Sequence, residues 1–122
     1  MSYDISIDIP EHDKKCPHCD NVVERVPVFP FAHWDPTYNY GPMFRAALGT
    51  DDGIHAWDGK TVAEVLPQLA RMVEAMVADP AKFRALNASN GWGTYDDLLP
   101  FLQDNMIPRF REAPDFAVVT VT

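Results

Sequence analysis

Basic residues are scarce in this chain of 122 residues, in which 10 Lys and Arg stand against 18 Asp and Glu, for a formal net charge of −8. Proteins that bind the phosphate backbone need clustered Lys and Arg, so the balance argues against a nucleic acid partner. The same charge keeps a small domain dispersed in water. It is also compatible with a basic protein partner or with mimicry of nucleic acid.

Long apolar runs and targeting signals are also missing. No run approaches the roughly 20 apolar residues that a membrane-spanning helix needs. The first residues, Met1–Ile5, have neither the basic region nor the apolar region of a secretory signal. We therefore expect a protein of the cytoplasm (the host cytoplasm if a phage encodes it) with no membrane partner.

Proline, in contrast, is plentiful. The chain has 11 prolines, nearly twice the usual share of about 5%. Leu, Ile, Val and Phe still make up about a quarter of the chain, above the floor of roughly 20% below which charged chains stay disordered. We expect one folded domain with interrupted helices and structured loops.

The N-terminal part has the pattern of a β-ribbon. Apolar and polar residues alternate over Ser2–Ile9, which predicts a half-buried strand that Pro10 ends. The valine-rich segment Val22–Phe29 predicts a second strand, which Pro27 moves toward a sheet edge. The two strands would form a ribbon over residues 1–30, on either side of a turn that contains both cysteines.

Helices are expected in the middle of the chain, after an irregular aromatic loop over residues 29–41. One apolar stripe at helical spacing marks the strongest helix, which Pro67 should kink or break. Pro100 and Pro108 should distort the last helix. Besides a short helix over 43–48, the predicted helices cover residues 61–78, 81–86 and 95–111.

The order of the elements predicts the fold class. A β-branched segment, Phe116–Thr122, predicts a closing strand, and the ribbon is the only sheet available to pair with it. We therefore predict a single α+β domain of order β-β-α-α-α-β, with helices on one face of a roughly three-stranded sheet. Within residues 1–122 it has three parts: the ribbon (1–30), a helical part with two aromatic loops (31–114) and the closing strand (115–122).

Cys16 and Cys19 are the only cysteines and form a Cys-Pro-x-Cys turn. In a cytoplasmic chain this spacing suggests a metal site or a redox pair before a structural disulfide. Redox pairs of the thioredoxin type begin a helix, whereas a turn between strands is typical of a zinc knuckle. Zinc prefers four ligands; His33 is the best third ligand, and His12 and Asp20 are weaker. Structural zinc, ordinary thiols and a redox pair all remain open.

Two segments, Thr37–Met43 and Ala85–Tyr95, combine aromatic side chains with Asn and Gly. Packed loops explain this composition, because Asn and Gly permit left-handed turns and Asn side chains bind loop backbone. The alternative is a pocket for a ligand or a partner. Its predicted residues are Tyr38, Asn39, Trp57, Asn90, Trp92 and Tyr95.

Three motifs carry a resemblance to known proteins: Cys16–Cys19, the segment Pro36–Phe44, and Ala85–Tyr95 with its Asn-Gly-Trp-Gly core. Together they resemble small acidic proteins of bacteriophages and actinobacterial prophages for which no activity is settled. The third motif is the most specific. The chain departs from the pattern at Asp35, Phe44 and Ala88, where those proteins have Asn, Trp and Pro. The resemblance implies a phage or prophage origin and no particular chemistry.

No pattern of a catalytic site is present in the sequence, since it has no nucleophile elbow, Walker loop or dinucleotide glycine motif. The nearest cluster, Asp51, Asp52, His55 and Asp58, is explained by turns. We therefore predict a non-enzymatic phage or prophage-type accessory protein that binds a host protein or itself, with a structural zinc as one of the open alternatives for the cysteine turn. The alternative is a small-molecule or nucleotide-binding protein, or a small hydrolase, that uses the loop pocket.

Overall fold

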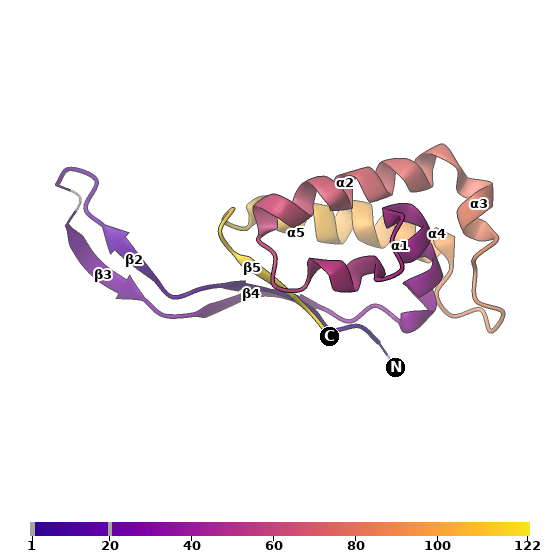
Figure 1. The fold of residues 1–122 in the computed structure, drawn as a ribbon, viewed down its shortest axis with the longest axis horizontal. Helices are drawn as coiled ribbons and strands as arrows, with labels where there is room; N and C mark the ends of the chain where they lie inside the picture. The colour runs from indigo at the N-terminus through magenta and orange to yellow at the C-terminus, as the bar shows by residue number, and fades with distance from the viewer. Residues whose placement is uncertain (1, 20) are drawn as a thin grey trace.

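The computed structural model describes residues 2–19 and 21–122, so the weaker metal candidate Asp20 lies outside the described residues. A body of helices packs on one face of a short sheet, and a two-stranded ribbon projects from it (Figure 1). The predicted α+β class is confirmed. The antiparallel sheet has the order β4-β1-β5, formed by β4 (Phe29–Trp34), β1 (Ile5–Ile9) and β5 (Val118–Val121). The ribbon consists of β2 (His12–Lys15) and β3 (Val22–Val26).

Strand β1 lies at the centre of the sheet, between β4 and β5. Its alternating apolar and polar residues match the buried and open faces of both neighbouring strands. Ile5 and Ile7 are fully buried, and each lies opposite residues of β4 and β5 that face the same core. Ser6, between them, belongs to the polar row on the open face. The predicted pairing of the first strand with the closing strand is therefore confirmed.

Two prolines divide what is otherwise one long hairpin. Ile9 pairs with Phe29 and His12 pairs with Val26, which leaves residues 10–11 opposite residues 27–28. Pro10 and Pro27 fall in this gap, and neither has the N–H that would continue the ladder.

The expected loop over residues 29–41 is partly wrong, because residues 29–34 form β4. Pro30 hid this strand from the sequence pattern. An edge strand accepts a proline because one of its sides lacks a hydrogen-bonding partner.

The predicted helices are present. The structure adds two short 3-10 helices, which are wound more tightly than an α-helix, and one π-helical turn, which is wider. Pro67 does not break α2, because six buried side chains on one face hold the helix to the core. Within the described part of the chain, no helix combines the length and the apolar character needed to cross a membrane. The helices are α1 (Gly41–Leu48), α2 (Val62–Ala78), α3 (Pro80–Arg84), α4 (Tyr95–Phe101) and α5 (Ile107–Glu112). The turns are two 3-10 helices (Tyr38–Tyr40 and Gly53–Trp57) and a π-helical turn (Leu102–Met106).

The π-helical turn joins α4 to α5 without a break. The backbone N–H of Ile107 donates to the carbonyl of Leu102, five residues back. Pro108, the next residue, has no N–H to donate to a carbonyl four residues back. The widened turn thus absorbs the distortion that this proline imposes on the predicted helix.

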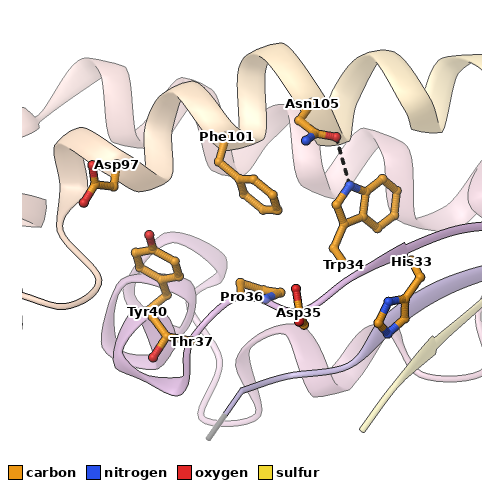
Figure 2. A pocket seen from close by; sticks show the side chains of 9 residues that line it. All are labelled: His33, Trp34, Asp35, Pro36, Thr37, Tyr40, Asp97, Phe101 and Asn105. Atoms are coloured by element: carbon orange, nitrogen blue, oxygen red, sulfur yellow. Dashed lines mark hydrogen bonds between the residues drawn. The ribbon is translucent and has the colours of Figure 1, made fainter.

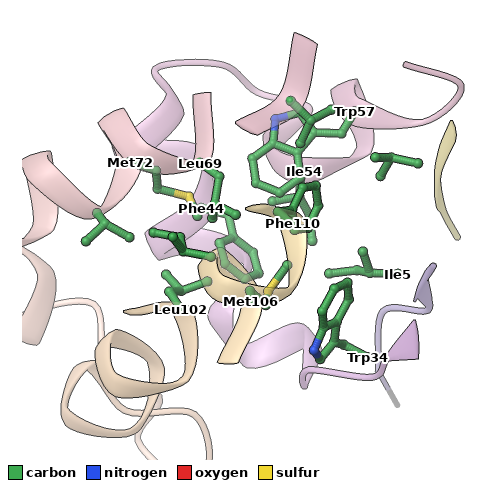
Figure 3. Packing of buried hydrophobic residues seen from close by; sticks show 14 of the residues in the cluster. Ile5, Trp34, Phe44, Ile54, Trp57, Leu69, Met72, Leu102, Met106 and Phe110 are labelled. Carbon is green, nitrogen blue, oxygen red and sulfur yellow. The ribbon is translucent and has the colours of Figure 1, made fainter. Parts of the chain in front are cut away.

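The core lies between the helices and the sheet (Figure 3). Trp34 of β4 stacks on Phe110 of α5 with ring centroids 5.6 Å apart. Trp57 is fully buried, and its indole N–H donates to Gln68 Oε1 at 3.1 Å. Burial of such large rings supplies the main stabilisation of a domain of this size.

Two contacts lie near the root of the ribbon, one to β4 of the sheet and one to β2. The guanidinium of Arg109 lies 3.9 Å from the ring centroid of Phe31 and donates to the Phe31 carbonyl at 2.8 Å. On the other strand, the ring of His12 meets that of Phe116 at 5.1 Å. The base of the ribbon is therefore anchored to the segment that contains α5 and β5.

Candidate functional site

The cysteine turn closes the far end of the ribbon (Figure 1). The backbone N–H of Cys16 donates to the carbonyl of Asn21 at 2.8 Å, which closes the loop between β2 and β3. Cys16 is partly exposed, Cys19 is exposed, and both are free thiols. A backbone hydrogen bond from His18, then side-chain and backbone bonds from Cys19, lower the pKa of the Cys16 thiol. The turn therefore makes the Cys16 thiolate, the form that binds metals and reacts with disulfides, easier to form than in an ordinary cysteine.

His33 does not complete a metal site with these cysteines, so this part of the prediction is corrected. It pairs with Ser6 in the sheet, and its Nε2 lies 3.3 Å from Asp4 Oδ1. Cys16 lies about ten residues beyond Ser6 along the ribbon, which is roughly 30 Å at about 3.3 Å per residue. Among residues 2–19 and 21–122, no three His, Cys, Asp or Glu side chains gather as metal ligands.

His12, the weaker histidine candidate, is also engaged away from the turn. Its Nδ1 lies 2.9 Å from the carbonyl oxygen of Pro10, and its ring packs on Phe116. The histidine therefore supports the root of the ribbon.

Two of the six predicted pocket residues belong to the core. Trp57 is fully buried, and Tyr95 is buried with its hydroxyl donating to the Met76 carbonyl at 2.8 Å. Sequence composition placed these rings in a pocket, but helix packing covers both of them. Neither is accessible to a ligand in this structure.

The other four residues lie nearer the surface. Trp92 is 73% exposed and Tyr38 is 40% exposed. Asn90 Oδ1 accepts a hydrogen bond from the backbone N–H of Trp92 at 3.0 Å, which stabilises the turn that carries the Trp92 side chain. The Asn39 N–H donates to Thr37 Oγ1 at 3.3 Å, at the start of a 3-10 helix. Of the predicted set, Trp92 is the side chain most available to a partner.

Gly93 brings the two aromatic segments together. Its φ is +84°, and a Cβ there would lie 2.8 Å from Asn39 Cβ and 3.0 Å from Thr37 Cγ2. Only glycine combines that backbone conformation with so close an approach. The last glycine of the Asn-Gly-Trp-Gly segment therefore has a packing role.

An open cleft of about 520 Å³ lies beside these loops (Figure 2). Phe101 and Asn105 on the helix face Trp34 on the strand across it, and the Trp34 indole N–H donates to Asn105 Oδ1 at 3.0 Å. Burial, and then the nearby charge of Asp97, raise the pKa of Tyr40. The lining residues are His33, Trp34, Asp35, Pro36, Thr37, Tyr40, Asp97, Phe101 and Asn105.

None of the six predicted pocket residues is among those that line this cleft. Trp34 and Asn105 are 71 positions apart in the chain, so no local pattern connects them. The only signal in the sequence was the aromatic segment over 34–40, of which Trp34 and Tyr40 line the cleft.

The acidic loop has structural explanations. Asp58 Oδ1 accepts the backbone N–H of Val121 at 3.0 Å, and the ring of His55 packs edge-on against Tyr3 at 5.2 Å. Asp51 and Asp52 are exposed in the turn before a 3-10 helix. The interpretation of these residues as turn formers fits this geometry.

Comparisons with protein-family models, with curated proteins and with solved structures give no match to this chain. The resemblance to phage and prophage proteins therefore stays a prediction. Function has to be inferred from the residues of the chain itself.

The packing role of Gly93 can be tested against a matched glycine. Gly91 has φ +79° with open space around its Cβ position, whereas Gly93 adds the close approach to Asn39. We expect Gly91→Ala to lower the free energy of unfolding by about 1 kcal/mol and Gly93→Ala by about 2 kcal/mol or more. Urea unfolding measures both. Equal losses would show that the approach to Asn39 is not a constraint.

The lowered pKa of Cys16 predicts a shifted pH profile of alkylation. Because thiolate is the reactive form, iodoacetamide should modify Cys16 at lower pH in the folded chain than in the urea-unfolded chain. By linkage, the thiolate adds stability above the unfolded pKa, and this stability is lost as the pH falls through the folded pKa. Mass spectrometry of the labelled peptide gives both midpoints; identical midpoints would contradict the hydrogen bonding.

Proposed function

We propose that this chain is a non-enzymatic accessory protein of phage or prophage type that acts by binding another protein chain through its β-ribbon. The observation that supports the proposal is a ribbon that extends beyond the core and keeps apolar side chains in water. In the ribbon, Val23 is 63% exposed; at its root, Val28 is 63% exposed and Phe29, the first residue of β4, is 57% exposed. Exposed apolar side chains on a projecting element are typical of contact surfaces.

The ribbon gains little stability from its own contacts. A two-stranded hairpin is marginal in water without a core. Arg25 bridges Glu11 at 2.7 Å and Asp13 at 3.2 Å across the strands. Such exposed pairs add little to stability, because water and salt screen their charges. Contact with a partner would cover the valines and order the strands further, which supports a binding role.

Trp92 offers a second point of contact. The loop that joins α3 to α4, which holds Trp92, lies at the opposite end of the molecule from the ribbon tip (Figure 1). Its indole is 73% exposed. Tryptophan is enriched among the residues that dominate binding energy at interfaces. This part of the predicted aromatic surface remains in the proposal.

Photo-crosslinking tests the ribbon contact. A photo-reactive benzoylphenylalanine replaces Val28 in one variant and Glu74, an exposed residue of α2, in the control. We expect irradiation in the source cells to give a discrete protein adduct from position 28, identified by mass spectrometry. Position 74 should give none, because nothing in the proposal places a partner there.

Two results would contradict the proposal. One is the same diffuse adducts from both positions, which would mean random encounters. The other is no adduct from position 28 although the variant is folded by circular dichroism, which would mean that the ribbon has no partner in those cells.

The cleft favours a second candidate function, the binding of a small organic cation. Asp35 and Asp97 carry carboxylates at a cleft whose aromatic walls include Trp34 and Tyr40. Aromatic faces and carboxylates both attract cations, and the carboxylates repel phosphate groups. Of the predicted ligand classes, nucleotides are therefore disfavoured.

A thermal-shift screen distinguishes the two ligand classes. At an aromatic amine concentration of 100 times Kd, binding should stabilise the fold by about 2.7 kcal/mol, and nucleotides should give no shift. Asp97→Asn should weaken the amine effect, while Asp104→Asn, on the exposed side of the π-helical turn, should leave it unchanged. No shift with any amine would rule out this candidate.

A further inference from the structure

The cysteine turn is half of a tetrahedral metal site. Structural zinc is held by four ligands, most often Cys and His. The chain has two cysteines, and the turn that carries them stands at the outer end of the ribbon. In the part of the chain that the structure describes, no third ligand joins them. Because the ribbon holds this turn away from the body, His33 and the other described ligands of the body do not reach it, and a second molecule can supply the remaining ligands.

We propose that two copies of this chain share one zinc ion at their ribbon tips, with Cys16 and Cys19 of each copy as the four ligands. This inference rests on the proposed function, since it names a second copy as the partner of the ribbon. Each thiol gives its proton to solvent when it binds. Zn²⁺ with four thiolates then carries two negative charges.

The charge distribution supports contact at the tip. The whole chain has a formal charge of −8. Residues 14–24 contain two lysines and two acidic residues, so their formal charge is zero. Tip-to-tip contact therefore joins two neutral ends and keeps the acidic bodies apart, where salt screens their repulsion. Lys15, next to Cys16, also brings positive charge to the doubly negative zinc site.

Apolar side chains beside the turn fit the same arrangement. Val22 and Val23 follow the turn directly and are 55% and 63% exposed. In a two-fold pair, each tip presents the same surface to the other, so the valines of both copies would meet around the metal. Their burial would add to the zinc–thiolate bonds and exclude water from the site.

The test uses the full chain, purified with zinc and a phosphine reductant that keeps all thiols reduced. Light scattering on a sizing column gives the mass, and mass spectrometry gives the metal content. We expect one zinc for every two chains and a mass twice the 13.7 kDa of one chain. Removal of zinc by a chelator should return the protein to single chains. Cobalt(II) in place of zinc should give the absorption of a tetrahedral tetrathiolate site.

Three variants identify the ligands. Cys16→Ser and Cys19→Ser should each abolish zinc binding and pairing, with thermal unfolding of the body unchanged because both residues lie at the tip. His18→Ala is the matched control, since His18 is exposed between the cysteines and is not a ligand in this arrangement. It should keep both the zinc and the doubled mass. Loss of zinc in His18→Ala would overturn the four-cysteine composition.

Other outcomes overturn the shared site in recognisable ways. One zinc per chain at the mass of a single chain would mean a site completed within the chain or by water. Absence of zinc under these conditions would leave the turn as a dithiol. A doubled mass that resists the chelator would contradict the zinc bridge yet support the ribbon contact. The crosslinking from position 28 can fail independently, so the two proposals are separable.

Discussion

Strand β1 is the element on which the rest of the structure depends. It is the only strand of the three-stranded sheet with a partner on each side, and those partners come from residues 29–34 and from the C-terminal end. Its buried isoleucines face the helices, so the sheet and the helical layer share one core. A change that moved β1 by one residue would turn these side chains to the open face and expose the core on both sides.

Strands β1 and β4 belong to the sheet, and the hairpin that they form continues beyond the sheet as strands β2 and β3. Up to Ile9 its apolar side chains have a core to enter, and beyond the gap at Pro10 and Pro27 they have none. The body has its own core, while the ribbon meets it at His12, whose ring packs on Phe116. The apolar side chains of the ribbon, Val22 and Val23, therefore stay exposed although its charged side chains pair with one another.

Much of the fold could be predicted from local periodicity. The alternation over 2–9 predicted β1, and the apolar stripe over 61–78 predicted α2. Strand β4 was missed because Pro30 and a bulge disturb its pattern. The candidate site was less predictable. Composition cannot separate buried Trp57 from exposed Trp92, because their burial depends on helix packing. The cysteine turn could be predicted from the sequence, but its distance from His33 could not, because that distance depends on how far the ribbon extends from the sheet.

The π-helical turn between α4 and α5 has a consequence for how this protein can vary. Leu98, Leu102, Met106 and Phe110 follow one another at intervals of four, and all are buried. In a regular α-helix each residue advances by about 100°, so such a row would slip by about 40° at every step. The wider turn cancels most of that slip and keeps one row facing the core. Loss of a single residue between 102 and 106 would rotate every later residue by about 100° and would turn the buried face of α5, including Phe110, away from the core.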